Sequence, residues 1–195
     1  MSENIELMMP IKAAPYEHQK KAFAFACDKF GVFDNQLKSR GTALLMEMGT
    51  GKTIVSIAIS GCMYQYGKLN RVLVVAPLSI LGVWEEEFAK VADFPYSLTI
   101  LKGTVAKKKE QLTKLPEEGM QVVVVNYESA WRLEKELLAY NPDLVIADKA
   151  HKLKENRSKQ SQGMQHIGDK AKYKLLLTGT VITNRELDVF SQYRF

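Results

Sequence analysis

Several features are scarce or missing in this chain of 195 residues. It has two cysteines and three histidines, too few for a disulfide framework or a zinc cluster. It has no apolar run long enough to cross a bilayer. Residues 1–9 carry two acids and no basic cluster, so they do not resemble a secretory signal. We therefore expect structural thiols at Cys27 and Cys62, a cytoplasmic location and no membrane partner.

Alternating patterns indicate the fold class. Apolar residues make up 46% of the chain and charged residues 25%, as in an ordinary globular domain. Residues 71–76 and 121–125 are apolar at every position after the first, which is typical of parallel strands buried on both faces. Strands are predicted at 42–47, 71–76, 97–102, 121–126, 143–147 and 174–178. Helices are predicted at 16–29, 52–66, 79–92, 105–114, 127–139, 158–168 and 185–193. The sequence thus predicts an α/β domain with a mostly parallel central sheet.

A glycine-rich loop follows the first predicted strand and precedes a helix. Its backbone N–H groups and the helix N-terminus would cradle a phosphate chain. Lys52 would reach the outer phosphates, and the Thr53 hydroxyl would be a Mg²⁺ ligand. The usual pattern has glycine six residues before the lysine, where this chain has Met46. The pattern predicts a P-loop NTPase that binds nucleotide through Met48, Gly49, Thr50, Gly51, Lys52 and Thr53.

A P-loop needs an acidic residue at the end of a neighbouring strand to hold the Mg²⁺ shell. The apolar residues 144–147 lead into Asp148, which supplies that acid, and Lys149 and His151 follow closely. With this motif the chain resembles the first RecA-like ATP-binding domain of a superfamily-two helicase, in the Swi/Snf-type, DEAH-like branch. That branch also occurs in bacteria and phages, and we expect such a source.

The resemblance implies a RecA-like three-layer domain over residues 1–195, with ATP and Mg²⁺ as cofactors. It also implies a second RecA-like domain, which is absent from this chain. Gln19 stands where relatives hydrogen-bond adenine, although alone it would be a surface helix residue. His151 would link the metal motif to a third motif, although a lone histidine is more often a packed or surface residue.

Two further motifs match the family's nucleic-acid and coupling motifs. Pro77 and Ser79 match a loop that touches the nucleic-acid backbone in relatives, although Ser79 could instead cap the helix that follows. Trp84 and Phe88 are interpreted as core residues. Residues 126–128 match another backbone-contact loop more weakly. The third motif would couple the nucleotide site to the nucleic-acid surface through Thr178, Gly179 and Thr180.

Lys149 departs from the family pattern. Relatives have glutamate there, acting on the attacking water, and a charged lysine with a reference pKa of about 10.4 cannot accept that proton. We therefore hypothesise that this form binds Mg-ATP but does not hydrolyse it. The second RecA-like domain would also supply an arginine worth about 10³–10⁵ in rate.

Positive charge is concentrated late in the chain. Residues 148–174 hold eight Lys or Arg and three acids, which accounts for the whole net charge of +5. Such a segment fits a polyanion, or alternatively a solvated lysine face. The resemblance of the motifs to those of the Swi/Snf-type branch favours duplex DNA over RNA as the nucleic-acid partner. Three other functions stay open: a non-hydrolysing regulatory nucleotide-binding module, a small-molecule kinase, and the motor lobe of a restriction or repair complex.

Overall fold

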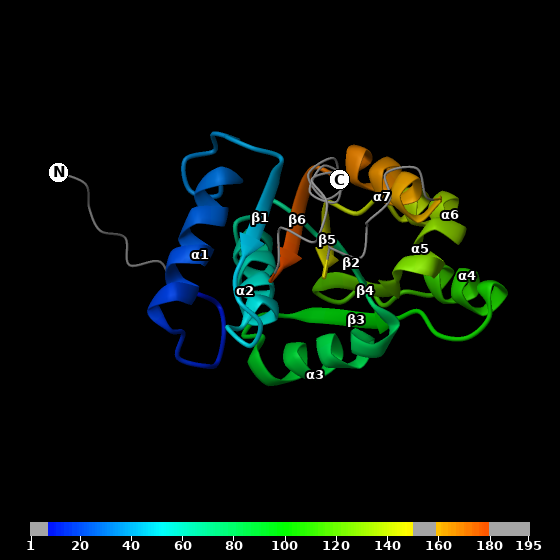
Figure 1. Cartoon of the computed structure of the whole chain (residues 1–195), viewed down its shortest axis with the longest axis horizontal. Helices are drawn as coiled ribbons and strands as arrows, with labels where there is room; N and C mark the ends of the chain where they lie inside the picture. The colour runs from blue at the N-terminus through cyan, green and yellow to red at the C-terminus, as the bar shows by residue number, and fades with distance from the viewer. Residues whose placement is uncertain (1–7, 150–158, 180–195) are drawn as a thin grey trace.

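The computed structural model describes residues 8–149 and 159–179 of the chain. A six-stranded sheet runs through its centre, in the order β1-β6-β5-β2-β4-β3, and every strand pair is parallel. Figure 1 shows the helices on both faces of this sheet. The strands are β1 (Gly41–Leu45), β2 (Arg71–Ala76), β3 (Tyr96–Ile100), β4 (Met120–Asn126), β5 (Leu144–Asp148) and β6 (Tyr173–Thr178). The predicted three-layer α/β, RecA-like P-loop fold is confirmed.

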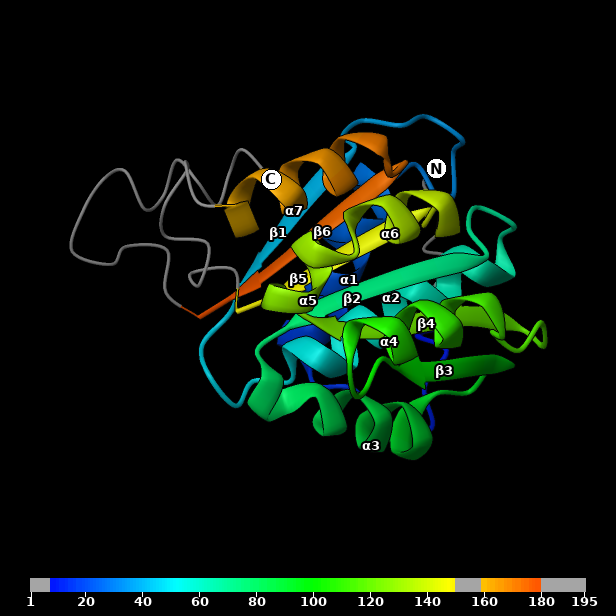
Figure 2. The ribbon, with the colours of Figure 1, turned by 90° about the vertical axis from the view of Figure 1, so that its right-hand side faces the viewer.

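Seven α-helices and one short 3₁₀ helix are present in the described ranges. They are α1 (Glu17–Lys29), α2 (Lys52–Gln65), η1 (Leu78–Ile80), α3 (Leu81–Val91), α4 (Val105–Thr113), α5 (Tyr127–Arg132), α6 (Glu134–Tyr140) and α7 (Lys159–Lys170). Figure 2 shows α4 to α7 in front of the sheet, with α1 and α2 behind it. None of the helices in this part of the chain is both long and apolar enough to span a membrane.

Two buried clusters hold the three layers together. Alternate residues of β2 point to opposite faces, so Val72 and Val74 pack against α1, α2 and α3 while Leu73 and Val75 pack against α5, α6 and α7. All four side chains are fully buried. Each such side chain contributes about 1.5–3 kcal/mol through burial. The apolar runs of the sequence therefore become strands covered on both sides.

Two helices differ from the sequence prediction. The helix predicted over 127–139 is broken at Leu133, which ends α5 with φ −104° and ψ 17°. Leu133 is fully buried in the second cluster, on the same face as Ala130 before it and Leu137 after it. The helix predicted over 79–92 starts as the 3₁₀ turn η1, which follows Pro77, and becomes α-helical at Leu81. The helix predicted over 185–193 lies outside the described residues.

Cys27 and Cys62 are both free and buried, where α1 packs on α2. A hydrogen bond with Cys62 raises the pKa of the Cys27 thiol, and burial raises it further. The interpretation of these residues as structural thiols agrees with their positions in the core.

Candidate nucleotide site and nucleic-acid groove

The loop between β1 and α2 has the backbone form that its glycines allow. Gly49 has φ +79° and Gly51 has φ +87°, and the second of these residues is the N-cap of α2. L-residues with a side chain rarely adopt such angles. The loop therefore ends with the first N–H groups and the positive dipole end of α2 directed at one point, as an anion site requires.

Lys52 folds back over this loop. Its Nζ donates hydrogen bonds to the backbone oxygens of Met46 and Glu47, at 2.7 and 2.8 Å. Thr50 Oγ1 also donates to Glu47 O, at 2.7 Å. Burial lowers the pKa of Lys52, repulsion from Lys149 lowers it further, and attraction to Asp148 opposes both. Met46, at the position where glycine is usual, is partly buried against the core and uses its carbonyl to hold the lysine.

Gln19 braces the same loop from α1. Its Oε1 accepts a hydrogen bond from Tyr16 N at 2.9 Å, and its Nε2 donates to Thr50 O at 3.1 Å. A Cβ on Gly51 would lie 2.3 Å from that Nε2, so the glycine is also needed for close approach. Gln19 is buried and not a surface residue. Its role toward adenine stays a prediction.

His18 also reaches the loop, which sequence reasoning did not foresee. Its Nε2 lies 2.9 Å from Thr50 O, and its ring stacks on that of Tyr16 with centroids 5.8 Å apart. Tyr16 is 70% exposed. In the sequence, the only indication that Tyr16 and His18 reach the loop was that they stand close to Gln19.

Asp148 is the last residue of β5. It lies at the C-terminal end of the parallel strands, the same end of the sheet at which the P-loop follows β1. It is buried, and burial raises the pKa of its carboxyl group. Hydrogen bonds from the Trp84 indole and the Lys149 backbone, and the charges of Lys149 and Lys52, oppose that rise. Trp84 Nε1 lies 3.0 Å from Asp148 Oδ2, and the Tyr127 hydroxyl donates to Asp148 O at 2.7 Å. Sequence reasoning placed Trp84 in the core but missed this contact.

Lys149 follows directly with φ +49°, an uncommon backbone angle for a residue with a side chain. It is partly buried. Its charge acts on both Lys52 and Asp148, which places the ammonium group in the electrostatic field of the site.

The donors at this edge fit a Mg²⁺ ion held together with a nucleotide. Asp148 supplies a carboxylate, and Thr53 supplies a hydroxyl on the first turn of α2. The part of the chain that the structure describes has no group of three or more His, Cys, Asp or Glu side chains that could hold a metal alone. Mg²⁺ usually takes one or two protein ligands and completes its shell with phosphate and water oxygens.

The third motif also meets the P-loop. β6 lies between β1 and β5, so Thr178 at its end is buried between the loop and Asp148. A Cβ on Gly179 would lie 3.6 Å from Lys52 Nζ and 3.4 Å from Met46 O. The structure thus brings Thr178 and Gly179 to the nucleotide site. His151 and Thr180 lie outside the described residues.

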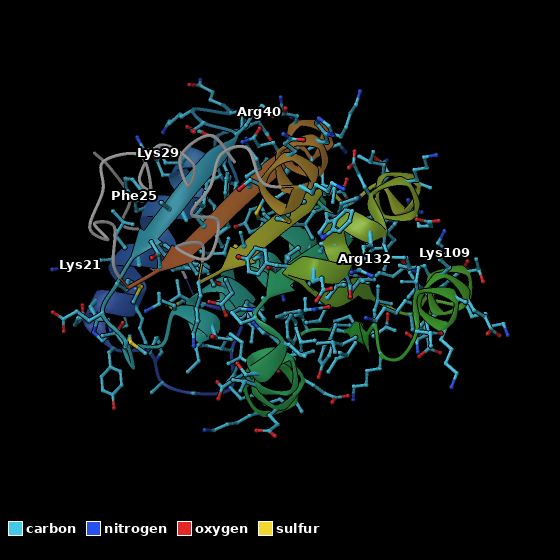
Figure 3. The ribbon with its side chains drawn as sticks, turned by 45° about the vertical axis from the view of Figure 1, so that its right-hand side comes forward. Lys21, Phe25, Lys29, Arg40, Lys109 and Arg132 are labelled. Atoms are coloured by element: carbon cyan, nitrogen blue, oxygen red, sulfur yellow. The ribbon has the colours of Figure 1, made fainter. Side chains whose placement is uncertain are left out.

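A groove of about 610 Å³ opens at the same edge of the sheet, beyond the ends of β3 and β4. Its cations are Lys102, Lys108 and Arg132, and Figure 3 shows Arg132 on α5. Lys108 Nζ donates to Ser129 Oγ, and Arg132 pairs with Glu128 at 2.8 Å. The other lining residues are Leu78, Leu81, Ile100, Leu101, Gly103, Thr104, Val105, Asn126, Glu128 and Ser129.

The predicted backbone-contact loops border this groove. Leu78, between Pro77 and Ser79, lines it, as do Asn126 and Glu128. Ser79 is exposed, and α3 begins without a side-chain cap, so Ser79 does not serve that helix. Sequence reasoning missed Lys102 and Lys108, for which the only signal was a Lys-Gly-Thr sequence after a strand.

The basic segment predicted late in the chain is divided by the fold. Lys170, Lys172 and Lys174 lie where α7 ends and β6 begins, at the sheet edge opposite the P-loop. Lys172 pairs with Asp143 at 3.3 Å. Lys170 and Lys172 are exposed, as a solvated lysine face predicts, whereas Lys174 is partly buried and burial lowers the pKa of its ammonium group. Residues 150–158 lie outside the described part of the chain.

Comparisons with known proteins agree on one family. The family model for the SNF2-related domain matches residues 16–195. "Switch 2" of Arabidopsis thaliana is 30% identical over 192 residues, covering 92% of this chain and 21% of that protein. "DNA repair and recombination protein RAD54-like" of Drosophila ananassae is 28% identical, covering 93% of this chain and 23% of that protein. The chain therefore spans under a quarter of the length of these two relatives.

Solved structures give the same result. The "Sulfolobus solfataricus SWI2/SNF2 ATPase core in complex with dsDNA" superposes with a TM-score of 0.78 at 28% identity, covering 95% of this chain and 36% of that one. The "Sulfolobus solfataricus SWI2/SNF2 ATPase core domain" gives a TM-score of 0.74 at 26% identity, covering 98% of this chain and 37% of that one. With its P-loop, Asp148 and third motif at one sheet edge, this chain belongs to the SNF2-related domain family.

Proposed function

We propose that this chain is the ATP-binding lobe of an ATP-dependent translocase that moves on duplex DNA. The observation that carries the proposal is the meeting of Lys52, Asp148 and Gly179 at one edge of the sheet, beside a groove lined by cations. One structural neighbour, the SWI2/SNF2 ATPase core of Sulfolobus solfataricus, is in complex with double-stranded DNA. That complex supports duplex DNA over RNA as the polyanion for this groove.

Mg-ATP is the proposed nucleotide. Lys52 would exchange its two carbonyl partners for the outer phosphates, and Thr53 and Asp148 would hold Mg²⁺ between them. Bound Mg²⁺ neutralises charge on the phosphate oxygens. Gln19 would hold the loop in place and reach adenine by rearranging its amide.

We further propose that the Lys149 form binds Mg-ATP without useful hydrolysis. A protonated lysine at this position cannot take a proton from water, and its charge opposes that of the metal. A second RecA-like domain, which these residues do not include, would complete the site and reopen it as the two lobes move on DNA. A bacterial or phage source and a cytoplasmic location stay predictions.

Nucleotide binding is the first test. A fluorescent ATP analogue is titrated into the chain with Mg²⁺ and with EDTA, and Lys52→Ala is the control. We expect binding by the unaltered chain and a loss of about tenfold or more in Lys52→Ala, because a charge-assisted bond to phosphate is removed. Equal binding by both forms would mean that the P-loop does not hold the nucleotide.

Hydrolysis is the second test, made with a form that carries both RecA-like domains. ATP turnover is measured for the Lys149 and Lys149→Glu forms, with duplex DNA, single-stranded DNA, RNA or no nucleic acid. Turnover that appears only in Lys149→Glu and rises with duplex DNA is the expected result. Nucleotide binding without turnover in either form would instead favour a regulatory nucleotide-binding module. This chain by itself, even as Lys149→Glu, should hydrolyse ATP very slowly.

A further inference from the structure

Two buried aromatic side chains contact Asp148 from opposite layers of the fold. Trp84 lies on α3 and donates from its indole Nε1 to Asp148 Oδ2 at 3.0 Å. Tyr127 lies on α5 and donates from its hydroxyl to the backbone oxygen of Asp148 at 2.7 Å. Trp84 is fully buried and Tyr127 is 6% exposed. The carboxylate and the backbone of one residue are therefore each fixed by a separate helix.

Trp84 brings a polar N–H group into an otherwise apolar cluster. Phe88 lies one turn further along α3, packs at a centroid distance of 6.4 Å from Trp84, and fills the same core without any polar atom. A buried indole N–H needs an acceptor, and here that acceptor is a carboxylate at the end of a central strand. The bond to a charged oxygen is stronger than a neutral one, and it fixes the rotation of the carboxylate.

We propose that Trp84 is a positioning residue for metal binding: its indole N–H orients the Asp148 carboxylate toward the Mg²⁺ of a bound nucleotide. This inference rests on the proposed function. Oδ2 accepts the hydrogen bond from the indole, so Oδ1 is the oxygen that would take the metal. Tyr127 holds the backbone of Asp148 from the other layer, so the strand end does not shift when the carboxylate takes a metal.

Nucleotide binding separates this role from a structural one. The affinity for a fluorescent ATP analogue is measured with Mg²⁺ and with EDTA in the unaltered chain, in Trp84→Phe and in Phe88→Leu. In Trp84→Phe the gain in affinity from Mg²⁺ should shrink about tenfold, with the affinity in EDTA nearly unchanged, because one charged hydrogen bond is lost. Phe88→Leu loses packing only, so its gain from Mg²⁺ should match that of the unaltered chain.

A double-mutant cycle tests whether Trp84 acts through Asp148. In an Asp148→Asn background, adding Trp84→Phe should cause no further change in the Mg²⁺ gain. An additive effect would show that the indole acts elsewhere, and would overturn the proposal.

The unaltered chain provides a measurement that does not depend on the folding of Trp84→Phe. Its two tryptophans give two indole N–H signals in a ¹⁵N NMR spectrum, and Trp131→Phe assigns them. The Trp84 signal should move when Mg²⁺ joins bound nucleotide, and stay in place with Mg²⁺ alone. An unmoved signal with nucleotide bound, or an unchanged Mg²⁺ gain in Trp84→Phe, overturns the positioning role and leaves the proposed function intact. A chain that binds no nucleotide overturns both.

Discussion

Replacing Gly51 by alanine tests how the P-loop is held. The residue has φ +87°, and an added Cβ would lie 2.3 Å from Gln19 Nε2. The left-handed backbone costs an L-residue about 1–2 kcal/mol. The Cβ would also displace the Gln19 amide and break its two hydrogen bonds, each worth about 0.5–1.5 kcal/mol. Gly51→Ala should therefore lower the free energy of unfolding by about 2–5 kcal/mol.

Gly49→Ala is the matched control, because it lies in the same loop with φ +79° and its added Cβ would meet nothing within 4 Å. It should cost only the backbone strain, about 1–2 kcal/mol. For a domain of this size, each kcal/mol shifts Tm by roughly 2–4 °C. Tm should fall by about 4–20 °C in Gly51→Ala and by about 2–8 °C in Gly49→Ala.

Thermal and urea unfolding, followed by circular dichroism, measure both variants without nucleotide. If the two variants unfold within about 0.5 kcal/mol of one another, Gln19 does not brace the loop and the reasoning fails. Adding Gln19→Ala to Gly51→Ala should recover part of the loss, because the clashing amide is gone.

Three other variants test single features of the fold. Thr42→Val should add about 1 kcal/mol of stability in urea unfolding, because Thr42 Oγ1 is buried without a partner in the described part of the chain; a loss would mean that the hydroxyl is paired. Burial raises the pKa of Tyr140, so stability from this group is complete below about pH 10 and is lost as the pH rises further. Tyr140→Phe should flatten that alkaline loss, while Tyr66→Phe, at an exposed position, should not. Because burial raises the pKa of Asp148, Asp148→Asn should be more stable than the unaltered chain at neutral pH, yet lose the Mg²⁺ gain in nucleotide affinity; a less stable Asp148→Asn would contradict this interpretation.

Local sequence determined the elements that depend on neighbouring residues. The runs at 71–76 and 121–125 became central strands because an apolar residue at every position suits burial on both faces. Gly49 and Gly51 shaped the P-loop because only glycine tolerates its backbone angles at low cost. The P-loop and Asp148 lie at the same end of the sheet because β1 and β5 run in the same direction, and the loop follows β1 while Asp148 ends β5. The sequence also predicts these parallel strands.

The break at Leu133 was not predicted from sequence. Residues 127–139 have a continuous helical pattern, and Ala130, Leu133 and Leu137 are buried at helical spacing on both sides of the break, so no local signal marked it. The charge of residues 148–174 likewise predicted one basic region. Because of the direction of β6, three lysines of that region lie at the end of the sheet opposite the P-loop. Composition does not record which end of a strand a residue occupies.

The sequence by itself determined the kind of site, and the tertiary structure decided how its parts are held. A strand, a glycine loop, a lysine and a distant aspartate can be read along the chain, because each motif is local. The contact from Trp84 to Asp148 joins residues 64 positions apart, and the groove of Lys102, Lys108 and Arg132 combines three elements. Both depend on which strands pair and how the helices lie across them. Strand order is set by the packing free energy of the whole sheet, which no local pattern contains.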